Sequence, residues 1–450
     1  MSNLPILFYL ICVLIVGLAP LSRRDRSADE YFFGGRTAGS VAFGSSLVLT
    51  NILRYQIILL PLAALGWFWV AVAGSVLVVA LSYMSQRNGA TEGNPGEVYG
   101  NGVPGVLVNG IVLLSYMTVQ IAALLAISNL ILKDILNLDY SASALIIVVF
   151  AGIYAIVGGF TAVAHTQTFQ LFVMLGGIVA LAIMNAIPPP DSLLPAFASS
   201  DELTTWGAFL GLPVVSLWVW HYDRLTLVQS RAPRNPFAMK SGLLLAGGAA
   251  IILALLVMLF PSASGSTEGG VAHEVLLLTC FAALMASFAA SFAGAAELAS
   301  NEFFRRAKPS ASEQEQVLVG RLVTAAIAGL TIIMLPMVQA HSAGLLQIFL
   351  IVQVSLFPPI TALFAAKSFF KTLPQAGILP SLIIGESLGI LRLVLSFVNT
   401  EQISGTWVAS WFISMDHFMF AFCLFGFSLL VLYGVGAVLG FRLRAADRLT

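Results

Sequence analysis

Apolar stretches long enough to cross a membrane recur along the whole of this 450-residue chain, and they constrain its fold more than any other feature. An α-helix needs about 20 predominantly apolar residues to span the hydrocarbon core of a bilayer. Because 59% of the residues are hydrophobic and only 9% are charged, no soluble domain of useful size is left over. We therefore predict an all-α polytopic membrane protein, embedded in the lipid bilayer, with about 13 transmembrane helices. The predicted spans are 4–21, 41–65, 66–85, 104–132, 141–158, 161–187, 205–226, 237–260, 272–304, 317–339, 342–366, 375–397 and 413–440.

Charge and cysteine usage argue against several classes of function. The 21 Lys and Arg residues balance the 21 Asp and Glu residues, so no basic surface predicts a nucleic-acid partner. Cys12, Cys280 and Cys423 lie far apart inside predicted spans, without the spacing of a metal or redox site. Gly34-Gly35 lacks the Lys-Ser/Thr pair that completes a phosphate-binding loop. We expect no enzyme activity and no catalytic or cofactor-binding residues, and the sequence leaves the oligomeric state open.

The positively charged residues predict the orientation of the chain, because Lys and Arg gather on the cytoplasmic side of a membrane protein. With the N-terminus outside, 18 of the 21 Lys and Arg residues fall in cytoplasmic segments. The long outer loops at 188–204 and 262–274 contain none. We predict a multi-pass protein of the cell membrane with its N-terminus outside and its C-terminus in the cytoplasm.

An odd number of spans also permits an inverted repeat, because two units of five helices would insert with opposite orientation. The second and seventh spans would open the two units, and both carry polar residues typical of a discontinuous helix. We predict a single transporter domain over residues 1–450. Its core has two halves at 41–226 and 205–366, meeting near 187–205, with one peripheral helix at 4–21 and two at 375–440.

The second span, residues 41–65, places Thr50, Asn51, Arg54 and Gln56 near the middle of the membrane. A guanidinium at that depth costs about 2.5–3.5 kcal/mol on insertion scales, so Arg54 must face a cavity or a partner rather than lipid. Asn and Thr side chains also compete for backbone hydrogen bonds, which favours an interrupted helix. We predict a substrate chamber lined by Asn51, Arg54 and Gln56.

Two roles for Arg54 stay open. In a chamber shielded from water, a guanidinium offers a two-pronged donor to a carboxylate, which predicts a small anionic solute. Alternatively, Arg54 pairs with Asp223 of the seventh span and fixes the two helices together. Either role requires the side chain to point into the protein.

Other polar residues have both a functional and a structural interpretation. Trp218, His221 and Asp223 of the seventh span can line the substrate chamber, although aromatic residues near a helix end are also ordinary interfacial residues. Gln120 of the fourth span can contact solute or form a hydrogen bond between helices. Glu297 can relay an ion leaving the site, or it can be locally paired.

Several short motifs follow one another in the order found in a known transporter family. They are Ala28-Asp29-Glu30-Tyr31-Phe32, Gly35-Arg36, Gly44-Ser45-Ser46-Leu47, Asn51-Ile52, Gly158-Gly159-Phe160-Thr161-Ala162-Val163, Ala283 to Ser287, Ser312-Glu313, Gly320-Arg321 and Pro358-Pro359. Together they resemble the sodium:solute symporter family, which includes the sodium–glucose cotransporters. The resemblance implies a LeuT-type core of ten helices with broken second and seventh spans. It also implies alternating access and symport of a solute with Na⁺.

The resemblance further implies a Na⁺ site where the second span meets the ninth. Its ligands would be the carbonyl oxygens of Leu49, Ile52 and Ala283 and side-chain oxygens at positions 286 and 287. Ser287 supplies a hydroxyl, but Ala286 has none, and Gln167 stands where the family has an aspartate. A hard cation needs about five or six oxygens, so these departures weaken the predicted site. Gln167 and Glu297 are the candidates for a coupling or exit role.

The residues and the resemblance together predict a secondary active transporter. It would couple Na⁺ to a small polar organic solute, with an anion such as a carboxylate as one candidate class. Ser75 and Ile251 stand near the positions where sugar-binding members have Glu and Lys, which disfavours a sugar. The alternatives are an uncoupled or proton-coupled carrier and a solute sensor that keeps the symporter fold, both suggested by Ala286 and Gln167.

Overall fold

The computed structural model describes residues 4–19, 27–64, 102–184, 186, 205–259, 270–370, 373–397, 412 and 414–447. These residues are helical apart from short connections and one isolated bridge between Ala38 and Pro233. Within them, seven helices are long and apolar enough to cross a membrane. The predicted all-α membrane protein is therefore confirmed for this part of the chain. The predicted span at 66–85 lies outside the described residues.

Helices occupy the other predicted spans. Up to residue 183 they are α1 (Leu4–Leu18), α2 (Ala28–Phe33), η2 (Gly34–Arg36), α3 (Ser40–Ala64), α6 (Val103–Ser115), η3 (Tyr116–Gln120), α7 (Ile121–Asn129), η4 (Leu130–Ile135) and α8 (Tyr140–Ile183). From residue 205 they are α9 (Thr205–Leu217), η6 (Trp218–Tyr222), α10 (Arg224–Gln229), α11 (Pro236–Leu259), α12 (Val271–Glu297), η7 (Leu298–Phe304), α13 (Arg305–Ala307), α14 (Glu313–Ala365), η8 (Ala366–Phe370), α15 (Gln375–Leu395) and α17 (His417–Asp447). The η3, η4, η6, η7 and η8 segments are π-helical, a form that is rare and often marks functional sites.

Two long helices each contain a break where two predicted spans meet. The backbone of α14 leaves the helical conformation at His341, with φ −134° and ψ 24°. The backbone of α8 does so at Gly159, with φ 58° and ψ −153°. A side chain at this combination of angles is strained, so the position requires glycine. The Gly158-Gly159 pair between the predicted spans 141–158 and 161–187 predicts a tight turn, and the break at Gly159 confirms it.

Gly159 also lies against the backbone of α2. A Cβ atom at position 159 would lie 2.4 Å from the carbonyl oxygen of Tyr31. We therefore expect Gly159→Ala to cost about 1–3 kcal/mol of stability, measured as a lower melting temperature of the purified protein in detergent. Gly176 of the same helix provides the control, because its Cβ position has nothing within 4 Å. Equal melting temperatures for Gly159→Ala and Gly176→Ala would contradict this backbone constraint.

The predicted interruption of the second span is wrong. α3 is an unbroken α-helix from Ser40 to Ala64, and it passes through Thr50 and Asn51 without leaving the helical conformation. The polar side chains find partners on other helices, and the bond from Asn51 to the Leu47 carbonyl of α3, across 3.1 Å, leaves the helix intact. Asn51 donates to the hydroxyl of Thr226 across 3.2 Å, and the hydroxyl of Thr50 accepts from the amide of Gln167 across 3.1 Å.

The predicted interruption of the seventh span is present. α9 runs into the π-helical turn η6, and Asp223 then adopts an extended backbone with φ −60° and ψ 142°. The N–H of Asp223 donates to the carbonyl oxygen of Trp218 across 2.7 Å and closes the turn. A new helix, α10, begins at Arg224. The seventh span is therefore two helices joined at Asp223.

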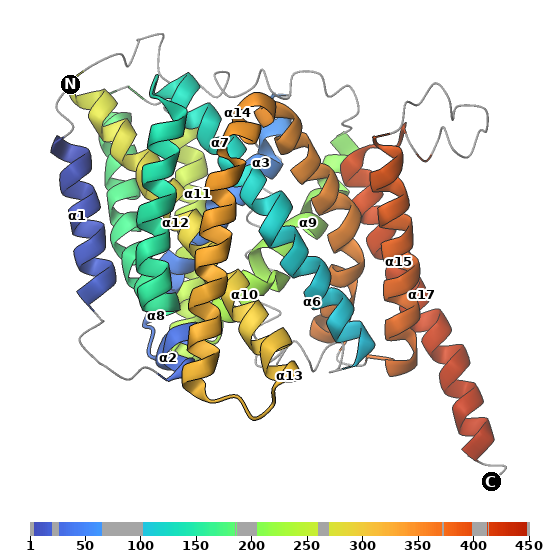
Figure 1. The fold of residues 1–450 in the computed structure, drawn as a ribbon. Coiled ribbons are helices and arrows are strands. Elements are labelled where there is room, and N and C mark those ends of the chain that lie inside the picture. Colours follow the sequence, from blue (N-terminus) through green and yellow to red (C-terminus); the bar gives the residue numbers. More distant parts are fainter. Residues whose placement is uncertain are drawn as a thin grey trace. The chain divides into compact units, whose positions relative to one another are not determined.

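The chain forms two compact units, each assembled from separate segments. Unit 1 comprises Met1–Val79, Val112–Ala198 and Arg224–Gln347, and unit 2 comprises Ala80–Ile111, Ser199–Asp223 and Ile348–Thr450. In unit 1, α8 packs along α12 and α1, and α3 packs against α8, α11 and α12 (Figure 1). In unit 2, α17 packs along α15 and α9.

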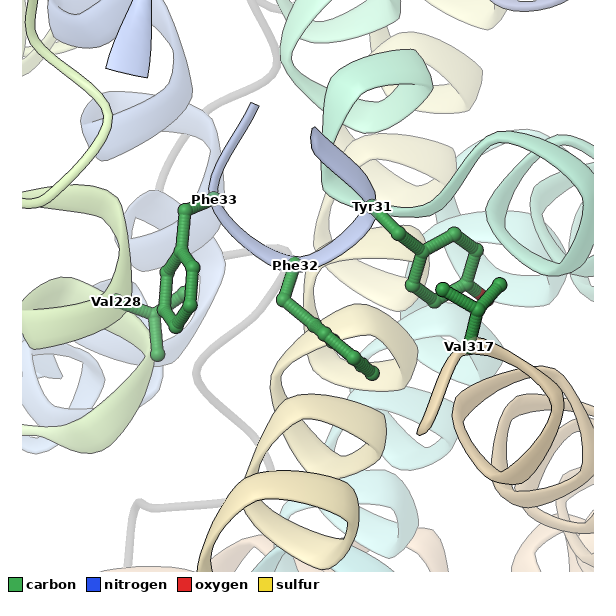
Figure 2. Packing of buried hydrophobic residues seen from close by; sticks show 5 residues of the cluster. All are labelled: Tyr31, Phe32, Phe33, Val228 and Val317. Carbon is green, nitrogen blue, oxygen red and sulfur yellow. The ribbon is translucent and has the colours of Figure 1, made fainter. Parts of the chain in front are cut away.

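The aromatic residues of α2 hold α10 in place within unit 1. Tyr31, Phe32 and Phe33 form a buried cluster with Val228 of α10 and Val317 of α14. Figure 2 shows Phe33 beside Val228 and Tyr31 beside Val317, on opposite sides of Phe32. The hydroxyl of Tyr31 also donates to a carbonyl oxygen of α8 across 3.2 Å. The short helix α10 is thereby fixed against its neighbours, and its polar residues reach α3.

Candidate functional site

One face of α3 is polar and fully buried. Ser46, Thr50 and Arg54 recur every four residues, so they lie on the same side of the helix. Together with Asn51, each of these residues is at most 2% exposed. Polar groups buried this deeply are expected to be hydrogen-bonded. Their partners on other elements come from η3, α8 and α10, and Gln167 of α8 also reaches α12; these contacts, all within unit 1, define the candidate site.

Arg54 joins α3 to η3. Its Nη1 donates to Oε1 of Gln120 across 3.1 Å, and its Nε donates to the carbonyl oxygen of Thr50 across 3.3 Å. Nη2 donates to Oδ1 of Asn51. The Nε2 atom of Gln120 is buried and donates to no described residue. A buried cation and an unused amide donor therefore lie side by side.

The broken seventh span contributes α10 to the same polar face. Asn51 donates from Nδ2 to the hydroxyl of Thr226 across 3.2 Å. Nε2 of Gln229, one turn further along α10, donates to the hydroxyl of Thr50 and to the carbonyl oxygen of Ser46, the latter across 3.4 Å. Both α10 residues are at most 4% exposed. The contact between α3 and α10 is thus made by matched donors and acceptors.

The polar face of α3 and its partners on η3, α8 and α10 form one polar layer, and Gln167 of α8 lies within it. Its Oε1 accepts a hydrogen bond from the hydroxyl of Ser46 across 2.6 Å. Its Nε2 donates to the hydroxyl of Thr50 across 3.1 Å and to the carbonyl oxygen of Ala286 across 3.3 Å. One neutral amide therefore links α3, α8 and α12.

Two of the predicted Na⁺ ligands lie in direct contact. The hydroxyl of Ser287 in α12 donates to the carbonyl oxygen of Leu49 in α3 across 3.0 Å. Ile52 and Ala283 are buried on the same two helices, with 6% and 8% exposure. Ala286 contributes no side-chain oxygen, and its carbonyl accepts from Gln167. The oxygens predicted to bind Na⁺ are therefore all neutral: the hydroxyl of Ser287 and the carbonyls of Leu49, Ile52 and Ala283.

A second charged group lies where α10 meets the end of α12. Arg224 donates two hydrogen bonds to Glu297, from Nε across 3.0 Å and from Nη2 across 2.8 Å. Nη2 also contacts Glu302 of η7 across 2.9 Å, and Glu302 pairs in turn with Arg306. Arg224 is 3% exposed and Glu297 is fully buried. Of the two interpretations of Glu297 from the sequence, local pairing is what the structure shows, and a relay role stays a prediction.

A comparison with known families identifies the kind of protein that carries this site. The model of the sodium:solute symporter family matches residues 96–188 and 246–385, more than half of the chain. The chain belongs to this family. It is 25% identical to sodium/glucose cotransporter 4 of Mus musculus, covering 89% of the chain and 70% of that relative. It is 24% identical to sodium/glucose cotransporter 1 of Oryctolagus cuniculus, covering 87% of the chain and 72% of the relative.

The fold of the symporter is also seen in a solved structure. A Na⁺-coupled sialic acid symporter, in a substrate-bound outward-open state, superposes with a TM-score of 0.70 over 96% of both chains at 17% identity. At this identity the likeness establishes the fold alone. The symporter is therefore a multi-pass membrane transport protein with a LeuT-like fold, as the sequence predicted.

The predicted aromatic residues of the seventh span belong to unit 2 of the symporter. Trp218 stacks on Phe357 with ring centroids 4.4 Å apart, and Tyr222 stacks on Phe364 at 5.3 Å. His221 lies edge-on to Tyr222 at 4.7 Å. These contacts are packing within one unit. Trp218, His221 and Asp223 belong to unit 2, whereas Arg54 belongs to unit 1, so their predicted common chamber stays a prediction. The side chain of Gln56, also predicted to line that chamber, lies outside the described residues.

Three residues of the polar layer are absent from the site predicted from the sequence. They are Ser46, Thr226 and Gln229, which all contact predicted site residues. Ser46 had a visible signal, because it precedes Thr50 and Arg54 at the same four-residue spacing. Thr226 and Gln229 follow the predicted break on the short helix α10. No spacing rule connects them to α3, so only the folded chain reveals their role.

Proposed function

We propose that this symporter carries a small organic anion together with Na⁺, and that Arg54 and Gln120 bind the carboxylate of the solute. The observation that carries the proposal is the pair of donors beside each other on α3 and η3. A guanidinium and a neighbouring amide present N–H groups that match the two oxygens of a carboxylate. The buried, unused Nε2 of Gln120 supports a ligand that accepts hydrogen bonds, since an unpaired buried donor costs about 1–3 kcal/mol.

Family membership and the contact between Leu49 and Ser287 support Na⁺ as the coupled ion. A Ser hydroxyl has two acceptor lone pairs besides its donor. It can therefore turn its proton away from the Leu49 carbonyl, so that both oxygens face a cation between α3 and α12. The carbonyls of Ile52 and Ala283 are the further ligands in this proposal. Binding of Na⁺ would favour whichever conformation holds these oxygens together, because a ligand shifts an equilibrium by its differential affinity.

A second candidate function rests on Gln167. Its amide nitrogen already donates to Thr50 and to the Ala286 carbonyl, so it can satisfy oxygens that would otherwise favour a cation. A protein of this kind would bind solute without Na⁺, as an uncoupled carrier or as a sensor. Purified protein in sealed vesicles separates the candidates. A Na⁺-coupled carrier accumulates labelled carboxylates above the outside concentration under an inward Na⁺ gradient. An uncoupled carrier only equilibrates them, and a sensor binds them without uptake.

The Na⁺ part of the proposal predicts a specific effect of Ser287→Ala. Removing one of five or six oxygens is expected to weaken the apparent Na⁺ affinity of uptake by about tenfold or more, with solute affinity at saturating Na⁺ preserved. The measurement is uptake as a function of Na⁺ concentration in vesicles. Thr279→Val is the matched control, because Thr279 lies on the same helix and its hydroxyl donates to the carbonyl of Val275, in its own helix. Unchanged Na⁺ dependence in Ser287→Ala would argue against this site.

A further inference from the structure

A carboxylate in the C-terminal part of unit 2 is buried without a partner. Glu386 lies near the middle of α15, an apolar helix long enough to cross the membrane. It is 8% exposed, and both of its carboxyl oxygens are buried and form no hydrogen bond with any described residue. An ionisable side chain inside a membrane helix is costly and is retained mainly where it binds something. Glu386 therefore requires a ligand or a role.

Two glycines on the same face of α15 bring neighbouring helices close to Glu386. A Cβ atom at Gly385 would lie 2.8 Å from the hydroxyl oxygen of Ser428 in α17. A Cβ atom at Gly389 would lie 2.0 Å from the carbonyl oxygen of Ser355 in α14. Positions three residues apart on a helix are neighbours, about 5–6 Å between Cβ atoms. Glu386 is three residues from Gly389, so it extends from the part of α15 that packs closely against both α14 and α17.

Oxygens on the helices packed against this part of α15 lack their usual partners. The carbonyl of Ser355 would accept from the backbone N–H of residue 359 in a regular helix, but Pro359 has none. The hydroxyls of Ser355 and Ser428 are buried and have no hydrogen-bond partner among the described residues. A carboxyl group, two hydroxyls and one carbonyl, all buried and lacking partners in the described part of the chain, therefore belong to segments of α14, α15 and α17 that pack together. Oxygens of this kind are the ligands of hard cations.

The negative charge of the Glu386 carboxylate can be neutralised by one positive charge. Glu386 forms no ion pair with the described residues, and Arg392, the basic residue of α15, donates to the carbonyls of Phe412 and Met415. A lone carboxylate in an apolar bundle is neutralised by one monovalent cation, whereas a divalent ion would leave a net charge. A proton would also neutralise it, but one O–H engages a single acceptor and leaves the remaining oxygens unsatisfied.

We propose that Glu386, Ser355 and Ser428 form a binding site for a small monovalent cation such as Na⁺, separate from the Leu49 and Ser287 contact of unit 1. Pro359 and the two glycines shape this site, since the proline leaves the Ser355 carbonyl without its helical donor and the glycines allow the helices to approach. The cation joins α14, α15 and α17, and so stabilises the folded chain in proportion to its concentration.

The test measures ²²Na⁺ binding and melting temperature of the purified full-length protein in detergent, with NaCl replaced stepwise by choline chloride. In the wild type we expect saturable Na⁺ binding and a melting temperature that rises with Na⁺. Glu386→Gln is expected to lose one bound Na⁺ per chain, and Ser428→Ala to bind that Na⁺ at least about tenfold more weakly. Ser287→Ala is the control, and the Glu386 component should persist in it.

Each result separates this site from the transport site. Loss of Na⁺ binding in Glu386→Gln but not in Ser287→Ala supports the Glu386 site even if the proposed Na⁺-coupled uptake fails. Full wild-type Na⁺ binding in Glu386→Gln overturns the inference. A wild-type melting temperature that depends on pH in choline but not on Na⁺, with the pH dependence lost in Glu386→Gln, also overturns it, because the carboxyl then holds a proton.

Discussion

Replacement of Arg224 by Met is expected to lower the free energy of unfolding by about 3–5 kcal/mol, because it leaves the buried carboxylate of Glu297 without its cation. Glu297 is fully buried and receives two hydrogen bonds from Arg224. The apolar Met side chain fills a similar volume, so the loss reports the unpaired charge rather than a cavity. The measurements are the melting temperature in detergent and the midpoint of unfolding in dodecyl sulfate.

Two further variants isolate the buried pair. Arg306→Met removes the partly exposed partner of Glu302 and is expected to cost about 0–1 kcal/mol. Arg224→Met combined with Glu297→Leu is expected to recover most of the stability, since Glu302 keeps its contact with Arg306 and no isolated charge remains. Equal losses in Arg224→Met and Arg306→Met would show that burial of the Arg224 pair does not decide the effect.

The Arg224 pair matters because it holds α10, and α10 supplies Thr226 and Gln229 as hydrogen-bond partners of the polar face of α3. Arg224 begins this six-residue helix, and Thr226 and Gln229 follow on it. A helix of this length is not stable alone, so its position depends on tertiary contacts. The Arg224 pair fixes α10 to α12, and the aromatic cluster of α2 fixes it from the other side through Val228. Disorder in α10 would remove two partners from Thr50 and Asn51.

The membrane spans could be predicted because hydropathy and helix length are properties of short windows. The break at Gly159 could be predicted for the same reason, since a Gly-Gly pair between two apolar runs indicates a turn whose backbone angles other residues rarely adopt. An interruption of the seventh span was predicted from its polar and aromatic residues, and the structure places it at Asp223. In each case the decisive information lay within a few residues of the feature.

The error at α3 has the opposite origin. Thr50 and Asn51 have the local preferences of an interrupted helix, and those preferences are outweighed by partners at positions 167, 226 and 229. Those residues are more than 100 positions away in the chain, so no local sequence pattern predicts that they contact α3. The same limit applies to Glu386, because the close approach of α14 and α17 to α15 at Gly385 and Gly389 is visible only in the folded chain.

Replacement of Gln120 by Glu is expected to weaken the uptake of anionic solutes strongly while preserving the fold. The new carboxylate still accepts from Nη1 of Arg54, so the link between α3 and η3 persists and gains an ion pair. The donor at Nε2 is replaced by a negative oxygen that repels the carboxylate of the solute. The lost charge-assisted hydrogen bond is worth about 1.5–3 kcal/mol, equivalent to roughly a 10- to 150-fold weaker affinity, and the repulsion adds to it.

Arg54→Gln tests the other half of the same donor pair, because it keeps a polar side chain but removes the positive charge. We expect it to weaken carboxylate uptake to a similar degree and to have little effect on a neutral amide analogue of the same solute. Uptake of carboxylates and of their amides into vesicles at saturating Na⁺ gives this comparison directly. If both variants lowered the melting temperature but left carboxylate affinity unchanged, Arg54 and Gln120 would be a purely structural cross-link between α3 and η3. The solute would then be bound elsewhere, and the anionic class would lose its physical basis, because the charge that selects it is the guanidinium of Arg54.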